Sequence, residues 1–157
     1  MGCEYCKNLE KYNFGDFLYE TNSWIIFLAP NQSNLGTCVI ALKRQERFLN
    51  SLTKEEWDEF SEIVNQLESS LKKAFNATMF NWGTLMNSFY LEDTLEPHMH
   101  WHFIPRYDHE VELDGELFED PFFGYMRPRP AKPISEKIKN NIKLAILKEL
   151  NGIEKNI

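Results

Sequence analysis

The chain has 157 residues, a length that fits one domain with a sizeable hydrophobic core. Its 24 acidic and 17 basic residues give a formal charge of −7, which opposes binding to nucleic acid polymers and to anionic membranes. No uncharged run approaches the roughly 20 apolar residues of a membrane helix, and the N-terminus has neither a basic start nor an apolar signal segment. We therefore expect a cytoplasmic protein.

The first third of the chain predicts three short strands. Residues 17–20 and 24–28 are two candidate strands joined by a Thr-Asn-Ser turn, and residues 38–42 form a third after a polar loop. Strands that follow one another with such short connections are expected to form a β-meander.

A long amphipathic helix is expected next. Thr53 is a candidate N-cap, and Glu56 stands three residues later, as in a capping box. Apolar residues then recur at steps of three and four, at Trp57, Phe60, Val64, Leu67, Leu71 and Phe75. We expect this stripe to pack on a sheet.

Two further strands are expected in the middle of the chain. Residues 78–87 contain aromatic and β-branched side chains interrupted by Gly83, and a segment from about Pro97 to Pro105 alternates histidine with apolar residues. Together with the meander and the long helix, these strands predict an α+β fold.

The last part of the chain is expected to hold loops and one helix. Residues 112–133 contain four prolines, so we expect loops there. Ser135 is a candidate N-cap, and Gly152 is the expected end, of a helix with one apolar face made by Ile138, Ile142, Ile146 and Leu150. We expect residues 1–110 to form the core of a single domain and residues 111–157 to be a loop-rich segment and helix of that same domain.

Three of the four histidines stand at every second position, at His98, His100 and His102. Successive side chains of a strand point to opposite faces, so these histidines are expected on one face. The residues between them, Met99, Trp101 and Phe103, are then expected in the core. Imidazoles two positions apart on a strand can also reach one transition-metal ion, so a metal site stays open at this point.

The run from Pro97 to Arg106, PHMHWHFIPR, resembles the signature of the histidine triad (HIT) family, which is His-apolar-His-apolar-His-apolar-apolar. The resemblance covers about residues 3–108. It implies an antiparallel sheet with a long helix packed on it and a C-terminal helix. It also implies a homodimer in which two sheets join into one extended sheet.

The resemblance further implies that the chain binds a purine nucleotide and cleaves a bond at the α-phosphate. His100 would be the nucleophile that carries the nucleotide, and His98 and His102 would hold the phosphate or relay a proton. The expected substrate is an adenosine phosphoramidate or a dinucleoside polyphosphate such as diadenosine tetraphosphate, with AMP as the product. No cofactor is required for this chemistry.

Four polar residues are candidates for binding the substrate. HIT family members place an amide about eleven residues before the first histidine, where this chain has Asn87, and Asn81 is a second candidate. The family's Gly-Gln element is replaced by Leu-Glu-Asp-Thr-Leu, so Ser88 and Thr94 are candidates for the missing donors. The apolar candidates for holding the base are Phe17, Leu18, Trp24 and Ile26. Each of them could equally be a residue of the hydrophobic core.

Cys3 and Cys6 form a single Cys-x-x-Cys pair. Some HIT proteins complete a structural zinc site with a histidine before the long helix and with the first triad histidine, but Gln45 stands at the former position. A structural zinc ion bound by Cys3 and Cys6 therefore stays open beside the alternative of two reduced thiols. Two other functions stay open as well: a non-catalytic nucleotide-binding module and a metal-dependent hydrolase that uses the histidine strand.

Overall fold

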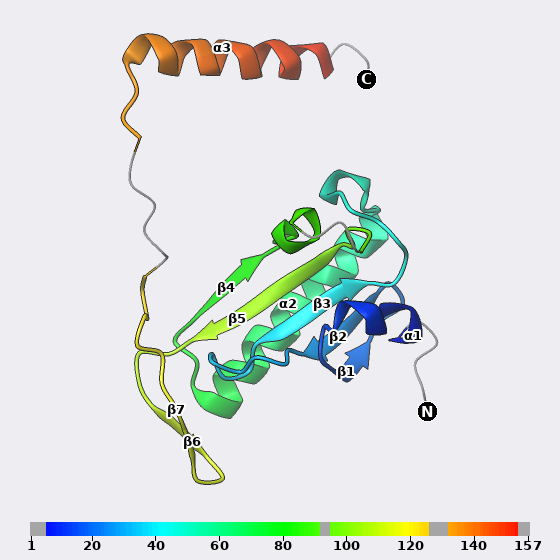
Figure 1. Ribbon diagram of the computed structural model, residues 1–157, viewed down its shortest axis with the longest axis vertical. Helices are drawn as coiled ribbons and strands as arrows, with labels where there is room; N and C mark the ends of the chain where they lie inside the picture. Colours follow the sequence, from blue (N-terminus) through cyan, green and yellow to red (C-terminus); the bar gives the residue numbers. More distant parts are fainter. Residues whose placement is uncertain (1–5, 92–94, 126–131, 154–157) are drawn as a thin grey trace. The chain divides into compact units, whose positions relative to one another are not determined.

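The computed structural model describes residues 6–91, 95–125 and 132–153 (Figure 1). The chain divides into two units, Met1–Phe123 and Gly124–Ile157. The first unit contains a five-stranded sheet with one long helix, and the second contains a single helix. The predicted α+β class is thereby confirmed, whereas the assignment of residues 111–157 to the domain of the core stays a prediction.

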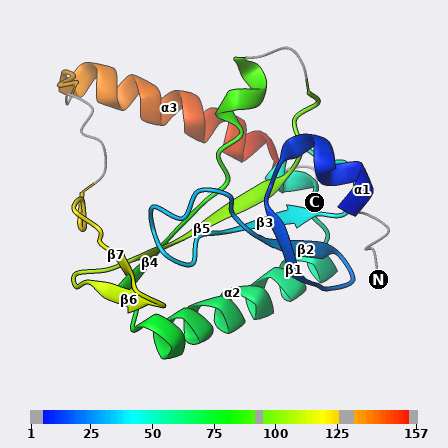
Figure 2. The ribbon, with the colours of Figure 1, turned by 60° about the horizontal axis from the view of Figure 1, so that its bottom comes forward.

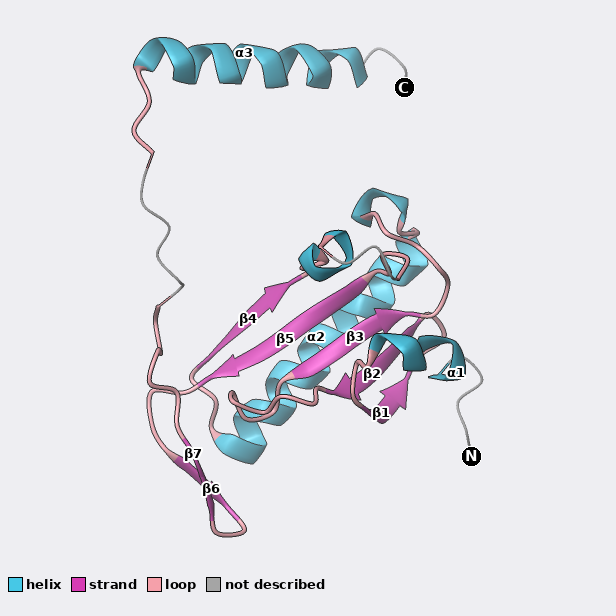
Figure 3. Ribbon diagram, viewed as in Figure 1, coloured by secondary structure: helices cyan, strands magenta, loops and turns pink. Residues whose placement is uncertain are grey.

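The five-stranded sheet has the order β1-β2-β3-β5-β4, and every neighbouring pair is antiparallel (Figure 3). Its strands are β1 (Asp16–Glu20), β2 (Trp24–Leu28), β3 (Cys38–Leu42), β4 (Met79–Gly83) and β5 (His100–Arg106). The predicted meander is confirmed in β1, β2 and β3. The histidine strand begins at His100 rather than at Pro97, so His98 precedes it.

The long helix α2 (Lys54–Phe75) covers one face of the sheet (Figures 1 and 2). It begins as predicted, because the Thr53 hydroxyl accepts from the Glu56 N–H and the Glu56 carboxylate accepts from the Thr53 N–H. The predicted stripe is wrong at two positions, since Trp57 is 39% exposed and Ile63, which was not in the stripe, is fully buried. The buried row therefore lies slightly to one side of the predicted one, along Glu56, Phe60, Ile63, Leu67 and Leu71.

The inner strands β2 and β3 are buried on both faces of the sheet. The main core lies between the sheet and α2 and includes Met99, Phe103 and the partly buried Trp101, as predicted. A second cluster lies on the opposite face under the N-terminal segment, and it consists of Leu9, Phe14, Ile25, Phe27, Ala29, Val39 and Ala41. Figure 2 shows α2 and the N-terminal helix on opposite sides of the sheet.

The N-terminal segment contains two short helices that the sequence pattern did not predict, α1 (Cys6–Leu9) and η1 (Glu10–Tyr12). Two further single turns are η2 (Leu49–Ser51), before α2, and η3 (Asn87–Tyr90), after β4. No helix among the described residues is long and apolar enough to cross a membrane.

A small hairpin follows the main sheet, where loops alone were predicted. Its strands are β6 (Val111–Leu113) and β7 (Glu116–Phe118), which pair antiparallel (Figure 3). The connecting residues Asp114 and Gly115 have φ values of 50° and 84°, and two successive residues at positive φ are what a tight two-residue hairpin turn of type I′ requires. The prediction of loops is therefore wrong for this stretch.

In the second unit, α3 (Glu136–Ile153) is the predicted last helix. Its first turn is capped as predicted, since the Ser135 hydroxyl accepts from the Ile138 N–H at 3.3 Å. The predicted end is wrong, because Gly152 lies inside the helix.

Candidate active site

His100 is held in one tautomer by the backbone of His98. Its Nδ1 lies 2.8 Å from the His98 carbonyl oxygen, which can only accept, so Nδ1 carries the proton. In the neutral ring Nε2 then bears the free lone pair. Burial lowers the pKa of His100 to about 4, so the ring is neutral at pH 7.

His102 lies beside His100 on the same face of β5. The Nε2 atoms of the two rings are 3.2 Å apart. On the neighbouring strand, Ala41 pairs with His100 and Val39 pairs with His102, and residues opposite each other across an antiparallel pair share a face. Both histidines therefore face the side of the sheet that carries the N-terminal segment. Burial lowers the pKa of His102 as well, although a hydrogen bond to the Leu85 backbone partly opposes this shift.

His98 is almost completely buried, with 1% of its surface exposed. Its Nε2 donates to the Leu42 carbonyl oxygen at 2.6 Å, and its Nδ1 lies 2.9 Å from Oε1 of Gln45. The ring also stacks on Tyr12, with 5.2 Å between the ring centroids. Both ring nitrogens thus have protein partners, and burial lowers the pKa of the ring.

A cavity of about 420 Å³ lies against His100 and His102. Its other walls combine aromatic and aliphatic side chains with neutral polar ones, namely Asn13, Asn31, Ser33, Asn34, Thr37 and Ser88. No Lys, Arg, Asp or Glu of the described chain lines it. The cavity therefore offers amide and hydroxyl donors and imidazole nitrogens, but no formal charge.

Of the three predicted substrate-binding residues that the structure describes, only Ser88 lines the cavity. Its neighbour Asn87, at the start of η3, is exposed and does not line it. Asn81, on β4, accepts a hydrogen bond from Nη1 of Arg106 at 3.0 Å and is likewise outside the cavity. Thr94 lies outside the described residues.

The apolar residues proposed to hold a base are placed elsewhere. Trp24 and Ile26 are fully buried in the main core, on the face of the sheet that packs against α2. Phe17 and Leu18 are about half exposed on the edge strand β1 and do not line this cavity. The apolar residues that do line the cavity include Phe14 and Val39, which belong to the cluster under the N-terminal segment.

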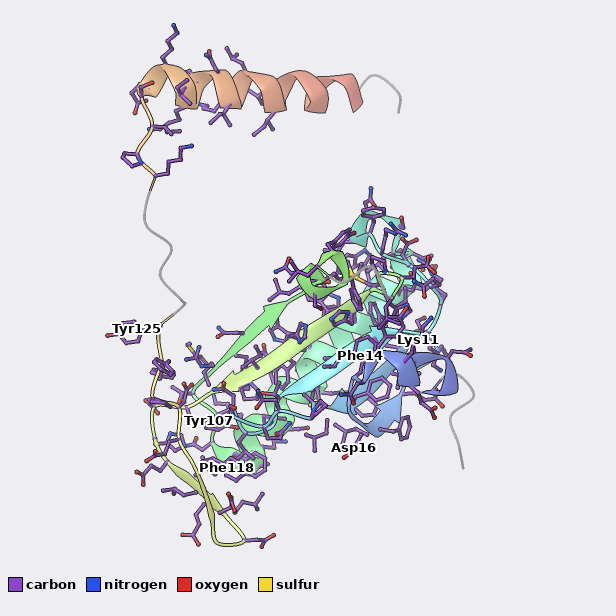
Figure 4. The ribbon with its side chains drawn as sticks, viewed as in Figure 1. Lys11, Phe14, Asp16, Tyr107, Phe118 and Tyr125 are labelled. Carbon is purple, nitrogen blue, oxygen red and sulfur yellow. The ribbon has the colours of Figure 1, made fainter. Side chains whose placement is uncertain are left out.

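Three aromatic rings around the histidines were not identified from the sequence. The Phe14 ring lies 4.8 Å from that of His100, and the Phe89 ring meets His100 edge-on at 5.6 Å. Tyr12 contacts both Phe89 and His98. Figure 4 shows Phe14 over the sheet beside the N-terminal helix. These rings keep water from His100, which accounts for its lowered pKa.

The residues at the candidate zinc site do not fit a zinc ion that uses His98. Gln45 stands where a histidine ligand was expected, and its amide lies against Nδ1 of His98, while Nε2 is bonded to Leu42. No ring nitrogen of His98 is left for a metal. Cys3 lies outside the described residues, and of Cys6 only the backbone is described. Among the described residues, no group of three His, Cys, Asp or Glu side chains could hold a metal ion.

The different surroundings of the histidines predict well-separated titrations. His100 should titrate near pH 4, whereas His109 should titrate above its ordinary value of 6.5, because its hydrogen bond to Asp108 favours the charged ring. NMR spectra of the histidine rings recorded from pH 3.5 to 8 would measure both midpoints in one sample. A midpoint for His100 at 6.5 or higher would contradict the burial described here.

Comparisons with known proteins agree with this geometry. A family model described as HIT domain matches residues 10–109. Similar solved structures are a HIT family protein from Bacillus anthracis (23% identity, 94% of this chain and 96% of that chain, TM-score 0.61) and a histidine triad nucleotide-binding protein from Candida albicans (19%, 97% and 99%, 0.62). At these identities they show a shared fold. A search among curated proteins gave no match.

Proposed function

Because the chain belongs to the HIT family, we propose that it is a nucleotide hydrolase or nucleotidyl transferase that cleaves at the α-phosphate of a purine nucleotide. One observation carries the proposal: the hydrogen bond from His100 Nδ1 to the His98 carbonyl leaves Nε2 unprotonated in a ring that lines the cavity. A neutral imidazole with a free nitrogen is a competent nucleophile toward phosphorus. The likeness to the nucleotide-binding protein from Candida albicans supports a nucleotide as the ligand.

The proposed reaction has two displacements. His100 Nε2 attacks the α-phosphorus, the N–P bond forms, and the bond from phosphorus to the leaving group breaks. His102, whose Nε2 is 3.2 Å from that of His100, is placed to relay a proton from a water molecule to the departing group. The hydroxide that remains attacks the nucleotidyl-His100 intermediate, the N–P bond breaks, and AMP is released with His100 restored. These steps use side chains of the chain and one water molecule.

The uncharged lining of the cavity bears on the leaving group. The leaving group of a phosphoramidate is an amine, so this substrate brings only the charge of its α-phosphate to the site, whereas a dinucleoside polyphosphate brings several negative charges. No cationic side chain of the described residues lines the cavity to balance such charges. We therefore propose an adenosine phosphoramidate as the better substrate and a dinucleoside polyphosphate as the weaker one.

We expect the wild-type protein to release AMP from an adenosine phosphoramidate at least about tenfold faster than from diadenosine tetraphosphate, since an uncompensated charge costs on the order of 1 kcal/mol or more. Initial rates measured with EDTA present would test this. Binding of AMP without release from either compound would favour the non-catalytic nucleotide-binding module. Activity that EDTA abolishes would favour a metal-dependent hydrolase.

We also propose a homodimer that forms by joining two sheets. β4 is an edge strand of the five-stranded sheet, so the outer side of its backbone has no partner strand within that sheet. Sedimentation at micromolar concentration is expected to give twice the chain mass of 18.6 kDa, and a monomer would contradict the proposal. The cytoplasm is the proposed location, which cell fractionation would test.

A further inference from the structure

On the basis of the nucleophilic role proposed for His100, we propose that Gln45 is a positioning residue. Its amide holds the Pro97–His98 segment, and the His98 carbonyl in turn selects the tautomer of His100. Gln45 lies between β3 and η2, more than 50 residues before the histidines in the chain. It does not line the cavity, so its effect on the reaction would pass through His98.

Gln45 belongs to a set of contacts that ties the segment after β3 to the segment before β5. Its Nε2 donates to the Pro97 carbonyl at 2.8 Å, and its Oε1 lies 2.9 Å from Nδ1 of His98. The backbones join beside it, because the Leu42 N–H donates to the Met99 carbonyl at 3.0 Å and the Met99 N–H donates to the Glu46 carbonyl at 2.6 Å. The Gln45 amide makes the side-chain hydrogen bonds of this set, and a longer ion pair, Arg47 with Glu96 at 3.8 Å, joins the same two segments.

An amide is well matched to His98. The bond to the Leu42 carbonyl requires a proton on Nε2 of His98. The protonation state of the ring can therefore change only at Nδ1. A protonated Nδ1 can donate to Oε1 of Gln45, and an unprotonated Nδ1 can accept from the same amide turned by 180°. Glutamine can therefore bond to the ring in both protonation states, which neither a carboxylate nor an apolar side chain can do. It holds Pro97 and a protonated Nδ1 at the same time, whereas the turned amide holds Nδ1 and gives up the bond to the Pro97 carbonyl.

The link to the reacting atom is the His98 carbonyl. This oxygen accepts from His100 Nδ1 at 2.8 Å and so keeps the proton off Nε2. If Gln45 is removed, the Pro97–His98 segment loses the hydrogen bonds of the Gln45 amide and keeps the contacts of Tyr12 and Leu42, so the His98 carbonyl can shift away from Nδ1. The other tautomer of His100 then becomes accessible, with the proton on Nε2, where it blocks nucleophilic attack.

The test uses Gln45→Met, which keeps the side-chain length and removes both polar atoms. Gln66→Met is the matched control, because Gln66 is also exposed and also accepts a hydrogen bond, from the Tyr19 hydroxyl at 3.2 Å, but lies on α2. ¹⁵N NMR of the histidine rings in the unliganded protein reports the tautomer of His100. Kinetics with an adenosine phosphoramidate separate kcat from KM.

We expect wild type and Gln66→Met to show His100 protonated only at Nδ1, and Gln45→Met to show a substantial fraction protonated at Nε2. In Gln45→Met, kcat should fall by about ten- to a hundredfold, while KM changes by less than about twofold. Gln45→Asn, whose amide is one methylene too short to reach both partners, should behave similarly and serves if the methionine variant folds poorly.

An unchanged His100 tautomer in both Gln45 variants would overturn the positioning role. The NMR measurement needs no turnover, so it decides the role of Gln45 even if the wild type releases no AMP. The absence of AMP release by the wild type would instead refute the proposed function. Loss of kcat with an unchanged tautomer would also overturn the proposal, because Gln45 would then act by some other route.

Discussion

Replacing His100 with alanine is expected to reduce the rate of AMP release by about a thousandfold or more. The substitution removes the nitrogen that is proposed to form the bond to phosphorus. We expect that His102 does not take over the attack, because its ring lies to one side of His100 and is hydrogen-bonded to the Leu85 backbone. Initial rates with an adenosine phosphoramidate, measured with EDTA present, would give the ratio.

The matched control is His109→Ala. His109 is the one histidine outside the triad, and its Nδ1 bonds to Asp108 in the loop after β5, away from the cavity. This variant should keep its rate within about twofold of wild type. AMP affinity measured by calorimetry should survive in both variants, which separates loss of chemistry from loss of folding. A rate within tenfold of wild type for His100→Ala would contradict the covalent mechanism.

The parts of the fold that the sequence predicted well are those specified by short-range patterns. The period of two around His100 placed Met99 and Phe103 in the core, and both are completely buried. Thr53 and Glu56 placed the start of α2 at the correct residue, because a capping box is a local hydrogen-bond pattern. Each of these features depends on residues that are neighbours in the chain.

The surroundings of the histidines could not be predicted in this way, because they come from distant segments. The Tyr12 hydroxyl donates to the Glu96 carbonyl 84 residues away, and Gln45 contacts His98 across 53 residues. Neither contact leaves a periodic signal in the sequence. The β6–β7 hairpin is a different case, because Asp114-Gly115 between two short strands is a local hairpin signal. Loops were predicted there because of the prolines that follow in the chain.

Arg106 is the site of the second large expected effect, which is on stability. Its guanidinium bonds to both carboxylate oxygens of Asp120, at 2.5 and 3.0 Å, and to the Phe122 carbonyl at 2.6 Å. Only 10% of the Arg106 side chain and 4% of the Asp120 side chain are exposed. Removing one partner of a buried ion pair leaves the other charge without compensation, so Arg106→Met should lower the free energy of unfolding by about 3–5 kcal/mol at pH 7.

Urea denaturation would measure this loss, with Lys54→Met as the control. Lys54 pairs with Asp58 on the surface of α2, where the two side chains are 80% and 63% exposed. Water and salt screen such a pair, and its loss should change stability by no more than about 0.5 kcal/mol. A loss below about 1 kcal/mol for Arg106→Met would mean that Asp120 finds another partner or reaches water.

The pH dependence of the same variant provides a stricter test, because its sign follows from Asp120. Burial raises the pKa of this carboxyl, but the bonds from Arg106 and from the Tyr107 N–H outweigh burial and leave the pKa below 3.8. In wild type, the stabilisation from this lowered pKa is present above about pH 4 and is lost as the pH falls through the native value.

In Arg106→Met, burial acts without the cation, so the pKa of Asp120 should rise above that of the unfolded chain. Acidification then protonates the uncompensated carboxylate and relieves its cost. The stability difference between the two proteins should therefore be largest near pH 7 and shrink toward pH 3, whereas a difference independent of pH would indicate that lost packing, rather than the buried charge, is responsible.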